Sequence, residues 1–415
     1  MQIIDDFISF IRRSPTVWHA AKEISGRLLQ AGFLAVKETD SWQLESGKAY
    51  FVLREGALIA FRLPSKTPDK VIIAASHSDS PALKIKPHPD LRSHDISQLS
   101  TEVYGAPLLH TWLDRDLCLA GRVITKDLKQ HLVHLTSHPL IIPSIPPHLE
   151  RTLQEKGLHI HKQDHLKPIF SLHPVSLFPL LAEHLKVSEI LSADLFLIPQ
   201  ESPALLGQDQ ELLASYRLDN LSSAYSSLQA LIETPSHPHT IQLAVFWDHE
   251  EIGSTSYTGA NSNFLTQTLQ RIFLHTNLSQ EDTFRLAANS LCLSIDVAHG
   301  FHPNFSDKFD SGHASYLGKG IALKFHADQK YATSAHTAAS IIQLCKTHNI
   351  PYQLFASRSD IPSGSTVGSF LAANLGIPTI DLGVPIWAMH SIRETLATQD
   401  QQSLSSLLLA AFNYC

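Results

Sequence analysis

The chain has 415 residues, 43% of them apolar and 17% charged, a length that predicts two or three domains and a composition that excludes a disordered protein. Its 32 lysines and arginines against 39 aspartates and glutamates give a net charge of −7, which argues against nucleic acid or an anionic membrane surface as a partner. The sequence shows no apolar leader, no stretch typical of a membrane span and no CxxC pair, so we expect a cytoplasmic protein in a reducing compartment.

Two helices are expected in the first 32 residues. Apolar residues recur at helical spacing over residues 3–13 and again over residues 17–29, and Gly32 offers a stop. Ser14 and Pro15 are predicted as the N-cap and the first residue of the second helix. Both helices are expected to pack on the core without taking part in chemistry.

Three short apolar runs, at residues 71–76, 241–247 and 291–295, are typical of strands buried on both faces. Helical patterns at residues 221–232 and 264–274 lie between the runs. This order predicts an α/β fold with a mainly parallel central sheet flanked by helices. Ligands of such sheets gather beyond the carboxyl ends of the strands, so the residues that follow each run are the candidates for chemistry.

Residues 88–212 differ from the rest of the chain. They are rich in proline and histidine and contain short alternating runs at residues 117–123 and 131–135. We predict that they form an inserted β-rich domain, and that residues 1–87 and 213–415 together form the domain that carries the chemistry.

Titratable side chains follow each of the three strand-like runs. His77 and Asp79 follow the first, Glu250 and Glu251 the second, and Asp296 the third. Because alternate residues of an extended chain share a side, Asp79 is predicted to orient the His77 imidazole toward a metal.

The pair formed by Glu250 and Glu251 is the sharpest local signal. Two like charges at a buried strand end are costly unless a metal compensates one of them or one takes a proton. This predicts a division of labour, in which one glutamate binds metal and its neighbour acts as a general base toward water.

Asp219, before a predicted helix, and His390, near the carboxyl terminus, complete the set, although Asp219 alone also fits an ordinary helix cap. The residue types are those of a two-metal hydrolase. Three carboxylates, two neutral imidazoles and a bridging hydroxide neutralise two divalent cations. Histidine and carboxylate ligands without thiolates suit zinc, with Mn²⁺ or Co²⁺ as other occupants.

Taken in order, the motifs resemble the aspartyl aminopeptidase family of zinc metallopeptidases. The matching stretches are His77-Ser-Asp-Ser-Pro81, Arg217-Leu-Asp-Asn-Leu221, Asp248-His-Glu-Glu-Ile-Gly-Ser254, Asp296-Val-Ala-His299 and Ala388-Met-His-Ser-Ile-Arg-Glu394. The resemblance spans nearly the whole chain. It implies a zinc-exopeptidase-like core, an inserted dimerisation domain at residues 88–212, and a dodecamer built from dimers.

Carried over residue by residue, the resemblance implies two Zn²⁺ per subunit and a role for each motif. Asp219 becomes the bridging ligand, His77 and Asp296 the other ligands of one ion, and Glu251 and His390 those of the second ion. Glu250 becomes the general base, and Asp79, which is expected to orient His77, is counted with it as a catalytic residue.

Substrate recognition is implied for His148, reaching in from a neighbouring subunit, and for His299, Lys324 and Tyr331. Their positive charge and hydrogen-bonding groups suit the side-chain carboxylate of an amino-terminal Asp or Glu. The predicted activity is hydrolysis of the peptide bond that follows such an acidic first residue. The stretch Pro362-Ser-Gly-Ser-Thr366 departs from the family, which usually carries a cysteine before Gly-Ser-Thr, and this leaves the preference between Asp and Glu open.

Two other functions compete with this prediction. A binuclear metal deacylase or carboxypeptidase would use the same type of core. A non-catalytic oligomeric scaffold that only holds metal is suggested by the 25 histidines.

Overall fold

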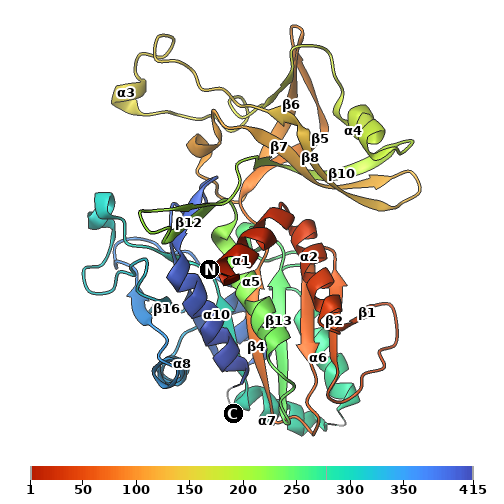
Figure 1. The fold of residues 1–415 in the computed structure, drawn as a ribbon, viewed down its shortest axis with the longest axis vertical. Helices are drawn as coiled ribbons and strands as arrows, with labels where there is room; N and C mark the ends of the chain where they lie inside the picture. Colours follow the sequence, from red (N-terminus) through yellow and green to blue (C-terminus); the bar gives the residue numbers. More distant parts are fainter. Residues whose placement is uncertain (1, 277, 414–415) are drawn as a thin grey trace.

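The computed structural model describes residues 2–276 and 278–413, which form two bodies joined at a narrow junction (Figure 1). The lower body in Figure 1 is built on a nine-stranded sheet and the upper body on a six-stranded sheet. A third, five-stranded sheet includes β12 (Leu212–Ser215), which lies where the two bodies meet.

The nine-stranded sheet is mixed, and its central strands β13, β4, β14 and β18 are parallel neighbours. Its strands in spatial order are β1 (Leu34–Val36), β2 (Ala49–Arg54), β3 (Ala57–Arg62), β13 (Thr240–Trp247), β4 (Lys70–His77), β14 (Leu291–Ile295), β18 (Thr379–Gly383), β16 (Ile321–Phe325) and β17 (Tyr352–Ala356). The three predicted buried strands are β4, β13 and β14. The predicted α/β class with a mainly parallel central sheet is confirmed.

Helices cover both faces of this sheet, each over its own apolar cluster. One face is covered by α1 (Gln2–Arg13), α2 (Val17–Gln30), α5 (Leu218–Glu233), α8 (Ala335–Thr347) and α10 (Thr398–Phe412). The other face is covered by α6 (Phe264–His275), α7 (Gln280–Asn289) and α9 (Val367–Leu375). The helices predicted from periodicity are α1, α2, α5 and α6.

The start of α2 corrects one expectation. Thr16, in extended backbone conformation, is its N-cap and the helix begins at Val17, so the assignment of Ser14 and Pro15 to the cap and first turn is wrong. The Ser14 N–H donates to the Ile11 carbonyl of the preceding helix. That bond makes Ser14 part of the turn between the helices, three residues before the second helix starts.

The six-stranded sheet is antiparallel throughout and encloses an apolar cluster of its own. Its order is β8 (Gln130–Leu140), β7 (Leu117–Thr125), β10 (Ile190–Pro199), β5 (Ala82–Ser93), β6 (Ile96–Tyr104) and β9 (Ile169–Ser171). The short helix η1 (Leu109–Trp112), α3 (Leu153–Lys156) and α4 (Leu177–Leu185) lie in its connections. The alternating runs predicted at residues 117–123 and 131–135 are strands β7 and β8.

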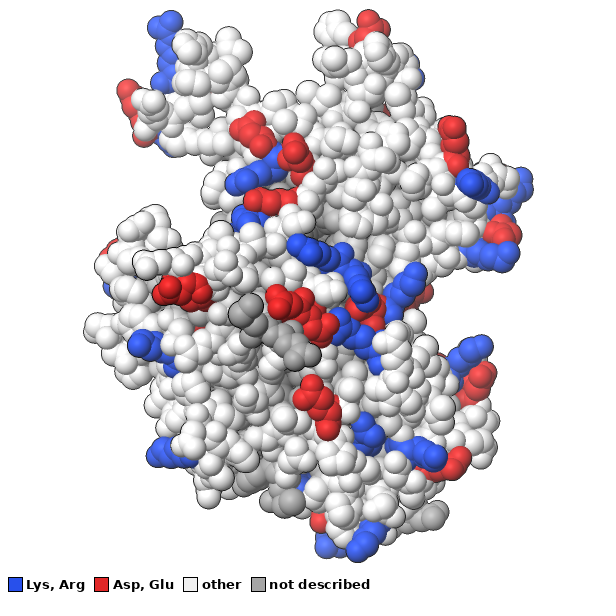
Figure 2. All heavy atoms as spheres, in the orientation of Figure 1, with Lys and Arg blue, Asp and Glu red and all other residues white. Residues whose placement is uncertain are grey.

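The five-stranded sheet runs β11 (Ala204–Leu206), β12, β20 (Glu394–Ala397), β19 (Pro385–Trp387) and β15 (Ala298–His299). Single helical turns occur at η2 (Glu250–Ile252) and η3 (Pro303–Lys308). Charged side chains are sparse and of mixed sign on the face seen in Figure 2, and several gather between the two bodies. None of the helices in the described ranges has the length and apolar character needed to cross a bilayer.

Candidate metal centre

The candidate residues converge at one edge of the nine-stranded sheet. His77 is the last residue of β4, Asp296 directly follows β14, and Glu250 and Glu251 form η2 just after β13. Because β13, β4 and β14 are parallel neighbours, their carboxyl ends lie together at this edge. Asp219, in the first turn of α5, and His390, between β19 and β20, join them from other parts of the chain.

Asp219 lies between the two histidines. Its Oδ1 is 3.3 Å from His77 Nε2 and its Oδ2 is 3.4 Å from His390 Nε2. Asp296 Oδ1 lies 3.6 Å from His77 Nε2, and Glu251 Oε2 lies 3.4 Å from His390 Nε2. The structure thus brings together all five residues predicted as ligands.

Three groups in the described chain have ligand atoms within 4.8 Å of one another, close enough to hold a metal ion. They are His77 with Asp219 and Asp296, Asp219 with Glu251 and His390, and His77 with Glu250 and Glu251. The first two share Asp219, which is the arrangement that a bridging carboxylate requires. The third would make Glu250 a ligand, so the role of Glu250 needs a test of its own.

The centre contains an excess of buried carboxylates, which favours the binding of cations. Burial, followed by repulsion from neighbouring carboxylates, raises the pKa of Glu250 to about 8 and that of Glu251 well above its usual value. The Glu251 Oε1 atom is buried and accepts no hydrogen bond from any described residue. Carboxylates thus outnumber the imidazoles that could pair with them, and this excess of oxygen ligands fits divalent cations.

The pKa of His390 is also shifted by the carboxylates of the centre. Burial lowers the pKa of its imidazole, but the hydrogen bond and charge of Asp219 outweigh that effect and raise the pKa to about 9. Its Nδ1 lies 3.0 Å from the Ala106 carbonyl oxygen, which leaves Nε2 directed at Asp219 and Glu251. A carbonyl partner on one ring nitrogen is the usual way in which a protein fixes a metal-binding imidazole.

Asp79 is a buried organiser of the residues after β4 and β13. Its Oδ1 lies 3.3 Å from His77 Nδ1 and accepts the Glu250 N–H at 3.2 Å, while Oδ2 accepts the Glu251 N–H at 3.2 Å. Oδ2 also accepts the hydroxyl of Tyr104 on β6 at 2.7 Å. The six-stranded sheet therefore reaches the centre through one tyrosine, a contact that the sequence gave no reason to expect.

Glu394 organises the opposite side in the same manner, and the sequence reasoning assigned it no role. It is 2% exposed, and its two oxygens accept the His390 N–H at 2.7 Å and the Asp219 N–H at 2.9 Å. Burial and the charge of Asp219 raise its pKa to about 8. The only sequence signal was its place at the end of the Ala388–Glu394 motif.

The predicted substrate residues fall into two locations. Lys324 on β16 is 1% exposed, donates to the Val297 carbonyl at 3.1 Å and lies 3.9 Å from Asp296 Oδ2. Its ammonium is 5.1 Å from the centre of the Tyr331 ring, and exposed His299 lies on β15 just after Asp296. His148 lies instead on an exposed stretch between β8 and α3, and it belongs to none of the three ligand groups.

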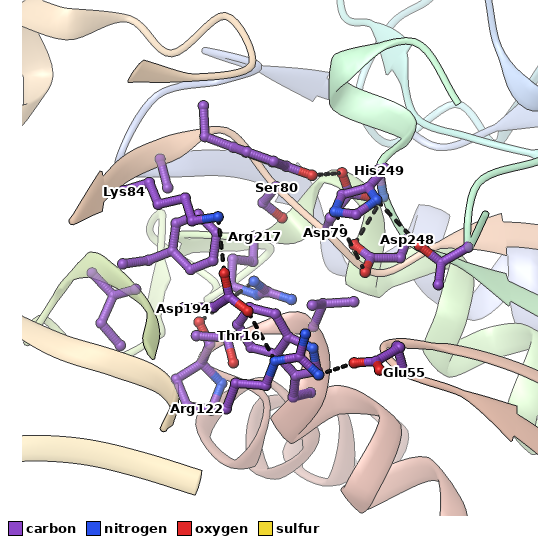
Figure 3. Close-up of a pocket in the computed structure, with 18 of the residues that line it drawn as sticks. Thr16, Glu55, Asp79, Ser80, Lys84, Arg122, Asp194, Arg217, Asp248 and His249 are labelled. Carbon is purple, nitrogen blue, oxygen red and sulfur yellow. Dashed lines mark hydrogen bonds and ion pairs between the residues drawn. The ribbon is translucent and has the colours of Figure 1, made fainter. Parts of the chain in front are cut away.

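A separate charged group lies on the other side of Asp79, in a cavity of about 190 Å³ between the two bodies (Figure 3). Lys84 Nζ lies 3.0 Å from Asp194 Oδ1, and Arg122 bridges Asp194 and Glu55. We call Glu55, Lys84, Arg122 and Asp194 the junction cluster. Asp79, Asp248 and His249 lie at the far wall of this cavity (Figure 3).

The chain is similar to known proteins over nearly its whole length. A family model described as "Aminopeptidase I zinc metalloprotease (M18)" matches residues 10–412. Two curated proteins named "Probable M18 family aminopeptidase 2", from Streptomyces avermitilis and Pseudomonas putida, are 40% and 39% identical over 98% of this chain and 96% of their own length.

Solved structures show the same likeness. "Crystal structure of prApe1" superposes with a TM-score of 0.93 at 26% identity, over 99% of this chain and 94% of that one. "Structure of S. cerevesiae mApe1 dodecamer" superposes with a TM-score of 0.87 at 26% identity, over 99% and 96% of the two chains.

Proposed function

The chain belongs to the M18 family of zinc aminopeptidases, and from that premise we propose that it removes acidic residues, Asp or Glu, from the amino termini of peptides. The observation that carries the proposal is a buried lysine, Lys324, beside a cluster of ligand side chains that has Glu250 at its edge. An exopeptidase that selects an acidic first residue needs both features in one place.

Two zinc ions per subunit fit the residues present, with Mn²⁺ or Co²⁺ as alternatives. We assign His77, Asp219 and Asp296 to one ion and Asp219, Glu251 and His390 to the other. When bound, zinc polarises a scissile carbonyl and lowers the pKa of water. Asp79 and Glu394 hold the backbone of the ligand-bearing segments through their paired N–H contacts.

Glu250 is the proposed general base. Its carboxylate lies 3.9 Å from His77 Nε2, at the edge of both proposed ligand sets, and belongs to neither of them. In this role it takes a proton from the attacking water and returns it to the amine that leaves when the peptide bond breaks. Asp79 fixes the Glu250 N–H, which limits the positions that the carboxylate can adopt.

Lys324, His299 and Tyr331 are the proposed recognition site for the acidic side chain. The carboxylate nearest to Lys324 is Asp296, itself a proposed zinc ligand, so the ammonium keeps its positive charge for an anionic substrate. A neutral first residue would leave that buried charge unpaired, which disfavours its binding. His148, exposed on the upper body, is proposed to act in the site of a neighbouring subunit.

We further propose that residues 88–212 form a dimerisation domain inserted into a catalytic domain of residues 1–87 and 213–415. Dimers would assemble into a dodecamer in the cytoplasm. Two features support this assembly: the six-stranded sheet has an apolar core of its own, and a solved relative is described as a dodecamer. Light scattering on the purified protein measures the assembly directly.

Kinetics on peptides with amino-terminal Asp, Glu, Leu or Lys test the activity. We expect kcat/KM for Asp and Glu to exceed that for Leu and Lys by at least roughly 100-fold, since the mismatched residues leave Lys324 unpaired. A chelator should abolish hydrolysis and zinc should restore it. Equal rates on all four peptides would contradict the proposed specificity.

Blocked substrates separate the competing functions. Faster hydrolysis of acetyl-Asp peptides than of free ones would favour a deacylase, and release of carboxyl-terminal residues would favour a carboxypeptidase. A metal-holding scaffold predicts no hydrolysis of any of these peptides by the zinc-loaded protein.

A further inference from the structure

A cavity of about 380 Å³ has in its wall His299, which follows the proposed ligand Asp296 by three residues, and Met389, the neighbour of the proposed ligand His390. Part of its wall is the strand pair β15 and β19, in which Ala298 pairs with Pro385 and His299 with Ile386. β15 begins two residues after Asp296, and β19 ends three residues before His390. The cavity is therefore built on the same two segments that carry proposed zinc ligands.

The wall of this cavity is mainly apolar. Its apolar side chains are Phe309, Phe355, Ile361, Pro362, Ile386, Trp387 and Met389. Small-molecule and side-chain sites in proteins have this character, a concave apolar wall of several hundred Å³ with a few polar groups at its edge.

The charged groups at the rim are engaged with partners of opposite sign. Arg358 forms paired contacts with Asp360 at 2.9 and 2.7 Å, and Lys308 Nζ lies 3.3 Å from Asp307 Oδ2. All of these pairs are exposed or half-buried. A cationic group already paired on the surface gains little from a second anion, so the cavity is suited to an apolar group and not to an acidic one.

Lys324 and Tyr331 are not part of the wall of this cavity, but both adjoin it, because Lys324 pairs with Phe355 of the wall and Tyr331 belongs to the same buried apolar cluster as Phe355. The centre thus offers two adjoining places for side chains, one beside a buried cation and one apolar, with His299 and Phe355 between them. Consecutive side chains of an extended peptide point in opposite directions, so a substrate bound across the centre needs two such sites.

We propose that this cavity binds the side chain of the second residue of the substrate, the one that becomes the new amino terminus, and that it selects large apolar residues there. This inference rests on the proposed function, which places the acidic first residue beside Lys324. The substrate class narrows to peptides that begin with an acidic residue followed by Leu, Phe or a similar side chain.

The test is a series of Asp-Xaa-Ala amides with Ala, Leu, Phe or Lys as the second residue, assayed on the zinc-loaded enzyme. We expect kcat/KM for Leu and Phe to exceed that for Ala and Lys by about tenfold or more, because burial of the extra apolar surface is lost with the smaller or charged residue. Equal values across the series would overturn the inference.

Phe309→Ala removes part of the wall, and Phe305→Ala is its matched control. Both phenylalanines lie in or next to η3, but Phe305 is 56% exposed and lies outside the cavity lining. Phe309→Ala should reduce the preference for Phe over Ala at the second position several-fold, and Phe305→Ala should leave it unchanged. Ile361→Ala, which changes another part of the wall, repeats the test independently.

Two results distinguish a failure of this inference from a failure of the proposed function. If Phe309→Ala and Ile361→Ala change selectivity at the first position instead, the cavity holds the first side chain. The same series behind an amino-terminal Leu separates the two ideas. Second-position selectivity without any preference for Asp at the first position would refute the proposed acidic specificity and support the apolar subsite.

Discussion

Two charged groups flank Asp79, and they differ in how their charges are satisfied. In the junction cluster, Asp194 meets both Lys84 and Arg122, and Glu55 meets Arg122. In the metal centre, four carboxylates crowd around two imidazoles, and the buried Glu251 Oε1 has no hydrogen-bond partner among the described residues.

The difference indicates what each group does. A cluster whose charges are paired is stable as it stands and serves to join the two bodies. A cluster with an excess of buried negative charge is costly to fold unless something positive binds there. The comparison therefore assigns a structural role to the junction cluster and a chemical role to the metal centre. Substitutions can perturb the two separately.

The largest effect is expected from Glu250→Gln, which keeps the shape of the side chain and removes the base. We expect kcat to fall by roughly 10³-fold or more with zinc content unchanged, since the proton acceptor is lost and the ligands remain. Glu55→Gln, in the junction cluster, is the control and should change kcat by less than about twofold. Loss of zinc from Glu250→Gln would show instead that Glu250 is a ligand.

Tyr104→Phe comes next, because Tyr104 connects the six-stranded sheet to Asp79. Without its hydroxyl, Asp79 holds His77 and the Glu250 backbone less firmly, and zinc affinity or kcat should fall by about 10 to 100-fold. The measurement is zinc affinity by competition with a chelator, together with kcat and KM.

Tyr216→Phe is the matched control for Tyr104. Its hydroxyl donates to the Pro81 carbonyl at 2.7 Å and lines the same cavity without reaching Asp79. Equal losses of zinc affinity and kcat in the two variants would mean that removing either hydroxyl from the cavity has the same effect. The bond from Tyr104 to Asp79 would then have no special role.

Arg122→Ala breaks the junction cluster and should affect stability more than chemistry. Removing a half-buried guanidinium that bridges Asp194 and Glu55 should lower the free energy of unfolding by about 1 to 2 kcal/mol. Urea denaturation measures the loss, and kcat should stay within about twofold. A large fall in kcat at unchanged stability would contradict the division between the two groups.

The last prediction concerns how stability depends on pH through His19, on α2 at the junction. Burial, followed by the charges of His134 and Arg217, lowers the pKa of His19 to about 3. The folded chain keeps this imidazole neutral while the unfolded chain protonates it near its ordinary pKa of 6.5. Stability from this group is therefore full above pH 6.5 and is lost as the pH falls toward 3.

His19→Gln should remove this dependence. Between pH 7.5 and pH 5 the unmodified protein should lose stability faster than the variant, by less than about 1 kcal/mol per pH unit. Thermal unfolding at the two pH values measures the difference. Equal slopes would show that His19 is protonated in the folded state as well.

The parts of the fold that follow local patterns were predictable. Apolar runs of five to seven residues predicted β4, β13 and β14, because nearly every residue of a strand that is buried on both faces is apolar. That the titratable residues after these runs lie close together was also predictable, because parallel strands end at one edge of their sheet.

The contacts that support the centre were not predictable. Tyr104 reaches Asp79 from another sheet, and Glu394 holds both Asp219 and His390, across separations that no periodicity records. The start of α2 was missed because Ser14, Pro15 and Thr16 all suit a helix start, and only the backbone conformation decides among them. The role of His148 stays a prediction, because it concerns a neighbouring subunit.

The most direct test of this account is diffraction from crystals grown with zinc, recorded on both sides of the zinc absorption edge. Two anomalous peaks per chain are predicted, one in contact with His77 and Asp296 and one in contact with Glu251 and His390, with Asp219 touching both. The junction cluster should show no peak. A single peak, no peak, or zinc bound through Glu250 would contradict the assignment of a free base beside two ions.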